Sequence, residues 1–147
     1  MAALVLVAAC GTLDPVDGPR AELDQARALW EDFEPSNYTY SVRRLCFCAP
    51  DAIGPVRVVV QDGVVSSAAY VATGDTVATT FRDLFPAVEG LFDVLENAYD
   101  TEADGVEVTF DDDTGVPTQF FIDFIEMAAD DELGYEITEP VTVVLPQ

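Results

Sequence analysis

Three cysteines are the residues of this chain best suited to chemistry. Cys46 and Cys48 flank Phe47, and Cys10 stands alone near the N-terminus. Two sulfurs at this spacing can form a disulfide, exchange it with another thiol, or contribute to a metal site. On an extended strand their Cα atoms would lie about 6.6 Å apart, near the upper end of the disulfide range of about 4.4–6.8 Å. A bond therefore requires a bend at Phe47, which the following Ala49-Pro50 favours.

We predict that Cys46 and Cys48 form a disulfide that fixes the end of a strand. A thiol–disulfide redox role is the alternative, but the sequence places no charged group evidently able to activate a thiolate. A metal site would need two further soft ligands, and Met127 is distant in the sequence. The structural disulfide is the preferred interpretation.

The acidic run Asp111-Asp112-Asp113-Thr114-Gly115 suggests calcium, with Asp111 and Asp113 as candidate ligands. It departs from the EF-hand pattern, because glycine falls at the fifth position and no glutamate follows at the required spacing. We interpret the run as a polar hairpin turn with Gly115 in the left-handed conformation. A calcium-dependent binding module stays an alternative.

Composition excludes several classes of function. Histidine is absent, which removes Ser-His-Asp and Cys-His catalysis. The 28 acidic residues against 6 basic ones give a net charge of −22, which disfavours nucleic acid as a partner. No catalytic constellation or cofactor motif stands out, so a non-enzymatic protein without a cofactor is favoured over an enzyme.

The N-terminus resembles the lipobox of bacterial lipoprotein signal peptides. Residues 4–9 are apolar and end in Val7-Ala8-Ala9-Cys10, so we predict that Cys10 is lipidated. No basic residue precedes Leu4, although a signal peptide needs a positive n-region, and we expect the true start to lie upstream. The predicted organisation is a signal segment over residues 1–10, a flexible tether over 11–20, and one α+β domain over 21–147.

The hydrophobic pattern predicts helices over residues 21–33 and 86–99. It predicts strands over residues 37–46, 106–110, 118–125 and 135–145, and a hairpin over 56–71 about the type I′ turn signal Asp62-Gly63. Pro140 should break the last strand or place it at an edge. No apolar run approaches the roughly 20 residues of a membrane-spanning helix. The expected fold is an antiparallel sheet of about six strands with two helices on one face, in the order αβββαβββ.

Packing of the predicted elements specifies a register and a core. In the hairpin, Val60 should pair with Val65, Val58 with Ser67 and Val56 with Ala69. The first helix should turn Phe33 inward with Leu23, Ala26 and Trp30. The residues expected to be buried together are Val58, Val60, Leu91, Leu95, Val108 and Phe110.

Asn37-Tyr38-Thr39-Tyr40, Cys46-Phe47-Cys48 and Asp131-Glu132-Leu133-Gly134-Tyr135 resemble, in this order, motifs of an uncharacterised family of small bacterial lipoproteins. The resemblance covers nearly all of the chain from Trp30 onward. It implies export, but no activity, ligand or catalytic residue. We therefore expect an extracytoplasmic protein of the cell envelope, held at the membrane through a lipid anchor, whose domain binds an envelope protein or ligand or has a structural role.

Overall fold

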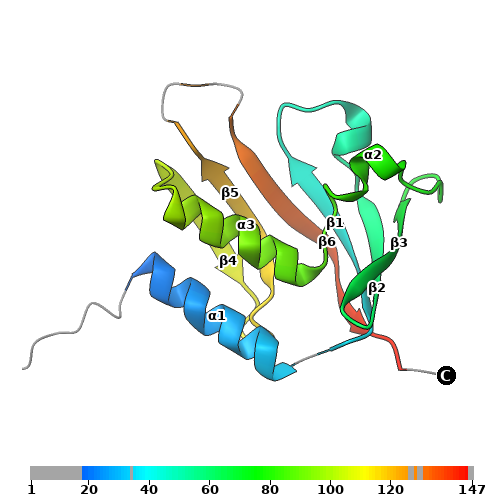
Figure 1. The fold of residues 1–147 in the computed structure, drawn as a ribbon, viewed down its shortest axis with the longest axis horizontal. Helices are drawn as coiled ribbons and strands as arrows, with labels where there is room; N and C mark the ends of the chain where they lie inside the picture. The colour runs from blue at the N-terminus through cyan, green and yellow to red at the C-terminus, as the bar shows by residue number, and fades with distance from the viewer. Residues whose placement is uncertain (1–17, 34, 126–127, 129–130, 146–147) are drawn as a thin grey trace, which may run out of the picture.

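A computed structural model describes residues 18–33, 35–125, 128 and 131–145 of the chain. These residues form one six-stranded antiparallel sheet with the strand order β3-β2-β1-β6-β5-β4, shown in Figure 1. The elements are α1 (Pro19–Phe33), β1 (Tyr38–Leu45), the 3₁₀-helix η1 (Pro50–Ala52), β2 (Val56–Gln61), β3 (Val64–Tyr70), α2 (Thr79–Arg82), α3 (Val88–Asp100), β4 (Gly105–Phe110), β5 (Pro117–Asp123) and β6 (Leu133–Val143).

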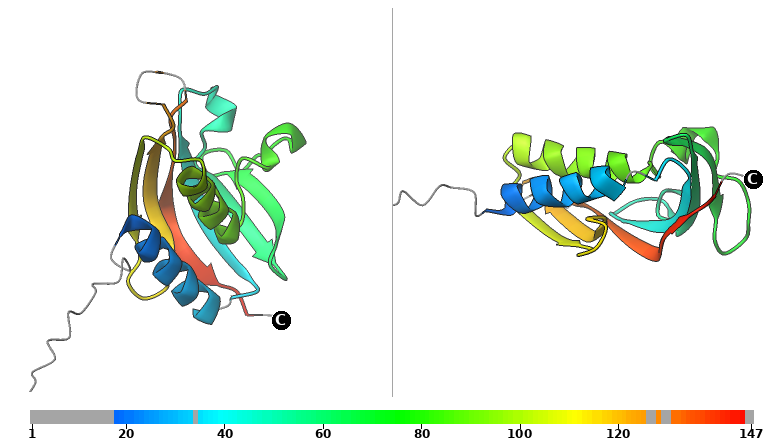
Figure 2. Two further views of the ribbon diagram at one scale, coloured as in Figure 1. Left: turned by 60° about the vertical axis from the view of Figure 1, so that its left-hand side comes forward. Right: turned by 90° about the horizontal axis from the view of Figure 1, so that it is seen from below.

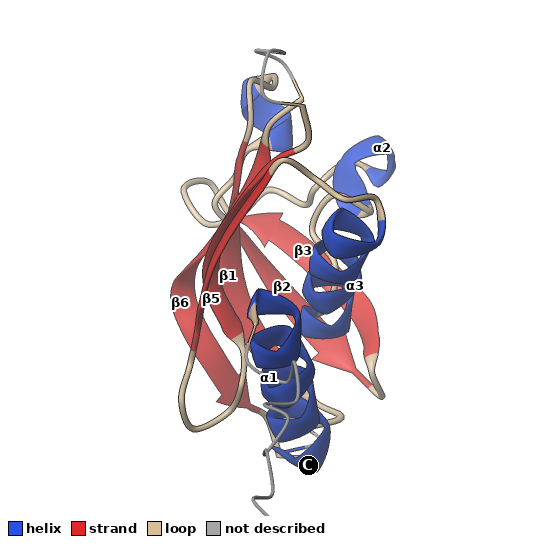
Figure 3. Ribbon diagram, turned by 90° about the vertical axis from the view of Figure 1, so that its left-hand side faces the viewer, coloured by secondary structure: helices blue, strands red, loops and turns tan. Residues whose placement is uncertain are grey.

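The two long helices, α1 and α3, lie side by side on one face of the sheet (Figures 2 and 3). This arrangement confirms the predicted α+β class and the order of long helices and strands. The short helices η1 and α2 were not predicted; α2 follows the linker after β3. None of the described helices is long and apolar enough to cross a lipid bilayer.

Helix α1 is amphipathic because its apolar residues recur at helical spacing. Leu23, Ala26 and Trp30 are buried against the rest of the core, as predicted. The helix begins at Pro19, a residue type suited to the first turn because its missing N–H would have no intrahelical partner. The prediction for Phe33 was wrong: its side chain is 42% exposed. Phe33 ends the helix and packs on one side against Trp30, with ring centroids 5.8 Å apart.

Helix α3 begins without a capping side chain of its own. Ala87 occupies the N-cap position and makes no side-chain hydrogen bond. Instead, the Tyr38 hydroxyl of β1 accepts a hydrogen bond from the Val88 N–H at 2.9 Å. Gly90, in the first turn of the helix, allows the close approach of Pro86: a Cβ there would lie 2.6 Å from Cβ of Pro86.

The β2–β3 hairpin turns at Asp62-Gly63, where φ is 51° and 74°, as a type I′ turn requires. The predicted pair Val60–Val65 is present, but a bulge follows, so that Val58 pairs with Ala68 and Val56 with Tyr70. The predicted pairing with Ser67 and Ala69 was therefore wrong by one residue. A bulge adds one residue to one strand and shifts every later pair.

Strand β6 contains Pro140 and lies between β1 and β5, so the prediction of an edge strand was wrong. The ladder with β1 is irregular between Thr39 and Val42, opposite Pro140, which accommodates a residue that cannot donate a backbone hydrogen bond. Pairing with β5 extends only from Leu133 to Glu136, so the proline falls where β6 is paired on one side.

The core lies between the sheet and the helices α1 and α3. Val58, Val60, Leu91 and Leu95 are fully buried, as predicted. Val108 and Phe110 are only partly buried against this core, because β4 is an edge strand. The aromatic residues of β1 belong to the core too: Tyr38 is 0% and Tyr40 1% exposed.

Candidate functional site

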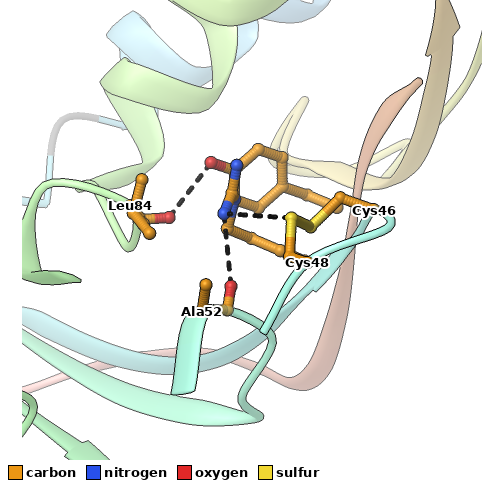
Figure 4. Close-up of a disulfide and its surroundings, with 6 residues drawn as sticks. Cys46, Cys48, Ala52 and Leu84 are labelled. Carbon is orange, nitrogen blue, oxygen red and sulfur yellow. Dashed lines mark hydrogen bonds between the residues drawn. A yellow bond between two sulfur atoms is a disulfide. The ribbon is translucent and has the colours of Figure 1, made fainter. Parts of the chain in front are cut away.

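Cys46 and Cys48 lie directly after β1, where the chain bends. Their Cα atoms are 5.3 Å apart and their Sγ atoms are at disulfide-bonding distance (Figure 4). The predicted bend at Phe47 is therefore present, and it brings the Cα separation within the disulfide range. The Phe47 side chain, between the two sulfurs in sequence, is 90% exposed.

A cation adjoins this sulfur pair. Arg44 Nη1 lies 3.9 Å from Cys48 Sγ and donates to the Ala52 carbonyl at 3.3 Å, and Figure 4 draws both contacts. The guanidinium carbon lies 5.8 Å from the centroid of the Tyr135 ring, close enough for a cation–π interaction. This contact corrects the expectation that no charged group is evidently placed to activate a thiolate at these cysteines.

The position of Arg44 follows from strand alternation. Tyr38, Tyr40 and Val42 are buried toward the helices, and the next residue on that face of β1 is Arg44. Arg43 has the opposite orientation and pairs with Glu136 of β6. The alternation was visible in the sequence, so a cation on the inner face, two residues before Cys46, was the signal that could have revealed this contact.

Tyr135 of β6 holds the other side of the guanidinium. Its hydroxyl donates to the Leu84 carbonyl at 3.0 Å, and its ring packs against Phe120 at a centroid distance of 5.4 Å. Burial raises the pKa of Tyr135, and the neighbouring Arg44 acts in the opposite direction. The residue is therefore a neutral phenol at physiological pH, fixed between the sheet and the linker before α3.

A shallow hollow of about 480 Å³ adjoins the cysteine pair. Its walls are apolar on several sides, and its charged side chains come from both faces of the strand end. Phe121 and Leu45 flank Gly134 here: a Cβ on that glycine would lie 3.2 Å from each side chain. The lining residues are Arg43, Arg44, Leu45, Cys46, Phe47, Ile53, Phe121 and Glu132.

The Asp111–Gly115 turn uses its own polar groups. Asp111 Oδ1 accepts hydrogen bonds from the Thr114 N–H at 2.8 Å, from the Thr114 hydroxyl at 2.7 Å and from the Asp113 N–H at 3.2 Å. The Thr114 hydroxyl, with help from the two backbone donors, lowers the pKa of Asp111. Among the described residues, no group of three or more acidic or cysteine side chains is placed to hold a metal ion. Asp111 thus acts as the acceptor of a hairpin turn, with Asp113 as one donor.

Trp30, Tyr38 and Tyr40 are core residues, and a carboxylate joins the first two. Glu89 accepts from Trp30 Nε1 at 3.0 Å and from the Tyr38 hydroxyl at 2.9 Å. Burial is the main cause of the raised pKa of Tyr38. The Tyr40 hydroxyl donates to the Pro86 carbonyl. These bonds connect β1 to α1 and to the start of α3, which gives them a structural role.

The sheet face turned away from α1 and α3, here called the open face, carries paired charges and hydroxyl groups. Arg57 Nη2 lies 2.9 Å from Glu139 Oε2, and the Ser41 hydroxyl donates to the same carboxylate. The bond from Ser41 and then that from Arg57 lower the pKa of Glu139. A second hollow, of about 430 Å³, adjoins this pair and also borders Thr39 and Thr142.

A family model described as a family of unknown function (DUF6174) matches residues 22–141. The chain belongs to this family. Neither the curated proteins nor the solved structures provide a match. The DUF6174 match extends from α1 into β6 and includes Cys46, Cys48 and Arg44. It agrees with the expected resemblance to an uncharacterised family. Cys10 precedes the matched segment and lies outside the described residues.

Proposed function

We propose that this DUF6174 protein is an exported protein of the cell envelope, anchored to the membrane by lipid on Cys10, whose domain is a binding module. The observation that carries the proposal is Val7-Ala8-Ala9-Cys10, which follows an apolar run and precedes a stretch rich in glycine, proline and aspartate. Cys10 stands nine positions before Pro19, the first residue of α1. At about 3.3–3.6 Å per residue, a tether of this length spans at most roughly 30 Å when fully extended.

Stable attachment by lipid requires more than one chain, because a single acyl chain binds only weakly. The expected modification of Cys10 is therefore a multiply acylated cysteine. The chain should be expressed in bacteria behind a complete export signal and labelled with an alkyne fatty acid. Wild type should incorporate label and fractionate with membranes, whereas Cys10→Ser should lose both properties. Cys46→Ser/Cys48→Ser is the matched control and should keep them. An unlabelled, soluble wild type would exclude the anchor.

The open face is the surface that best fits an envelope polypeptide as partner. α1 and α3 cover the other face of the sheet. The open face presents hydroxyl groups and the ion pair Arg57–Glu139 beside a hollow. Hydroxyls and paired charges of both signs suit the polar rim of a protein interface. The net charge of −22 disfavours nucleic acid and anionic lipid headgroups as direct ligands of the domain.

Site-specific cross-linking tests this surface. A photo-reactive amino acid at Thr142, exposed on the open face, should capture one defined envelope protein in intact cells. The same group at Asn97, exposed on α3, is the control and should not. An excess of purified domain should compete with capture at Thr142. Equal capture from both positions, or capture without competition, would reject the open face as the binding surface.

A further inference from the structure

Arg44 is unusual among the arginines of this acidic chain. Four of the six arginines form ion pairs within the described part of the chain: Arg20, Arg27, Arg43 and Arg57. Arg44, like Arg82, has no carboxylate at ion-pair distance among the described residues. Its guanidinium instead contacts a sulfur, a backbone carbonyl and an aromatic ring. A cation that carboxylates leave unpaired is available to stabilise a different negative charge.

The contact makes the two sulfurs inequivalent. Nη1 of Arg44 lies 3.9 Å from Sγ of Cys48, and no such contact to Cys46 exists among the described residues. A guanidinium beside a sulfur favours its thiolate form. In exchange reactions, a sulfur that is stable as a thiolate is the better leaving group. Cleavage of the disulfide should therefore leave the negative charge on Cys48, and the attacked sulfur should be Cys46.

The surroundings indicate what kind of thiol would reach Cys46. Both cysteines are partly exposed, and Cys46 lines the hollow of about 480 Å³. Leu45, Ile53 and Phe121 form apolar walls, and Phe47 exposes 90% of its side chain beside them. An exposed aromatic residue next to a partly apolar hollow suits the side chains of a polypeptide more than a small hydrophilic thiol.

We propose that Cys46–Cys48 is an exchangeable disulfide that oxidises a pair of cysteine thiols in an extended polypeptide, with Arg44 as the positioning residue that stabilises Cys48 as the leaving thiolate. A substrate thiolate attacks Sγ of Cys46. A mixed disulfide forms, the Cys46–Cys48 bond breaks, and its electron pair goes to Sγ of Cys48. The second substrate thiolate then attacks the substrate sulfur of the mixed disulfide and releases Cys46 as a thiolate.

The overall reaction is balanced by two electrons and two protons. The substrate dithiol is oxidised to a disulfide, while Cys46 and Cys48 are reduced and take up the two protons that the substrate thiols release. A small-molecule disulfide such as oxidised glutathione returns the pair to its starting state. The inference rests on the proposed export in one respect only: export places the disulfide in an oxidising compartment. The tests below use purified protein, so their failure would leave the lipid anchor untouched.

The first test measures each thiol of the reduced protein separately. The full chain should carry Cys10→Ser, so that Cys46 and Cys48 are its only cysteines. Alkylation rates at each site are measured by mass spectrometry as a function of pH. The charged side chains around the hollow are Arg43, Arg44 and Glu132, and Asp51 lies on the neighbouring η1. With Arg44 adjoining it, Cys48 should have its rate midpoint at lower pH than Cys46.

The matched variants separate charge from structure. Arg44→Gln should raise the Cys48 midpoint by about 0.5–1 pH unit, a three- to tenfold change in thiolate fraction, and leave Cys46 unchanged. Arg44→Lys should retain much of the difference. Arg43→Gln, the adjacent arginine that pairs with Glu136, should leave both midpoints unchanged. If Arg44→Gln fails to fold, wild type provides the test. Its Cys48 midpoint should lie below its Cys46 midpoint, and added salt should reduce this difference.

The second test identifies the attacked sulfur and the substrate class. The oxidised protein is mixed with a short synthetic peptide containing two cysteines and neutral apolar side chains, and the reaction is stopped with acid. Peptide should be found on Cys46, and oxidised peptide should appear in equal amount to reduced protein. Peptide should react at least tenfold faster than reduced glutathione at equal thiolate concentration. Equal midpoints for the two cysteines, attachment mainly to Cys48, or equal rates with peptide and glutathione would each overturn the proposal.

Discussion

The bend at Cys46–Cys48 and the turn at Asp111–Gly115 differ in where their polar contacts originate. In the acidic turn, the Asp111 carboxylate is satisfied by donors two and three residues away. In the cysteine bend, the sulfur pair meets Arg44, which is held by Ala52 of η1 and Tyr135 of β6. A turn that satisfies its own polar groups has little left for a ligand. A bend beside a cation that other elements hold in place keeps a group that can respond to a change of charge.

This difference also explains why the shorter motif carries the stronger functional argument. Clustered carboxylates are expected by chance in a chain with 28 acidic residues. Arg44 and Arg82 both lack an ion pair in the described part of the same chain, and Arg44 is the one whose guanidinium contacts a cysteine sulfur and an aromatic ring. The informative observation is therefore the neighbour of the cysteine pair, more than the spacing of the cysteines.

The largest expected effect tests the structural role of the acidic turn. Gly115 has φ of 75°, and a Cβ there would lie 2.0 Å from the Ala26 carbonyl oxygen of α1. Gly115→Ala should lower the free energy of unfolding by about 3 kcal/mol or more, from the left-handed conformation and the clash with α1. Urea unfolding monitored by circular dichroism gives this value.

Gly63→Ala is the matched control for this substitution. Gly63 has φ of 74°, but no atom would lie within 4 Å of a Cβ added there, so only the conformational cost of about 1–2 kcal/mol applies. If the two substitutions cost the same, the contact of the acidic turn with α1 does not contribute to stability.

A second prediction concerns the support of the cysteine bend. Tyr135→Phe removes the hydroxyl that donates to the Leu84 carbonyl at 3.0 Å but keeps the ring under Arg44. Because the carbonyl partner is partly buried, the free energy of unfolding should fall by about 1–3 kcal/mol. The alkylation midpoint of Cys48 should stay unchanged.

Tyr70→Phe removes a similar bond, to the Asp51 carbonyl at 2.7 Å, at an exposed site. Water replaces that donor, so thermal unfolding should show a smaller loss of stability, below about 1 kcal/mol. A change in the Cys48 midpoint in Tyr135→Phe would mean that the hydroxyl, and not the ring alone, determines the position of Arg44.

Local patterns predicted the elements of this fold well. The spacing of Leu23, Ala26 and Trp30 predicted α1, and Asp62-Gly63 predicted the hairpin turn, because both depend on nearby residues. The bulge after Val60 and the central place of β6 were missed. Register and strand order depend on contacts between distant segments, which a single sequence does not display.

In the candidate site, too, the features set by nearby residues were predicted and those set by distant segments were not. Cys46 and Cys48 were identified from their spacing, and their bend from the residues that follow. The contact with Arg44 could be predicted only by following the alternation of β1 to Arg44, the last residue on its inner face. The contact with Tyr135 depends on the pairing of β6 with β1, which the sequence alone does not reveal. The support of Tyr135 by the Leu84 carbonyl joins residues 51 positions apart and left no local signal.

The third prediction separates stability from chemistry at the cysteine bend. Cys46→Ser/Cys48→Ser should lower the free energy of unfolding by at most about 1.6 kcal/mol, the chain-entropy value for a loop of three residues. Thiol counting in oxidised wild type under denaturing conditions should find neither cysteine free. The double variant should lose all peptide oxidation while its circular dichroism spectrum is retained. A variant that unfolds would show that the bond is chiefly structural.

The smallest effect is expected at Asp111. Asp111→Ala removes the acceptor for three donors of an exposed turn, and the cost at neutral pH should be about 0.5–1 kcal/mol, as for the loss of a helix cap. The pKa of Asp111 is lowered in the folded protein by the Thr114 hydroxyl and the backbone N–H groups. A carboxylate with a lowered pKa stabilises the folded state fully above its unfolded pKa, about 3.9.

The difference in stability between wild type and Asp111→Ala should therefore be constant from pH 7 to about pH 5. It should decrease below about pH 4 and vanish once the pH falls below the lowered folded pKa. Asp112→Ala is the control, since Asp112 is exposed in the same turn and should show little dependence of this kind. Added calcium tests the alternative of a calcium-binding module. If millimolar calcium raises the melting temperature of wild type but not of Asp111→Ala, the Asp111 carboxylate binds the ion, and the turn does more than satisfy its own polar groups.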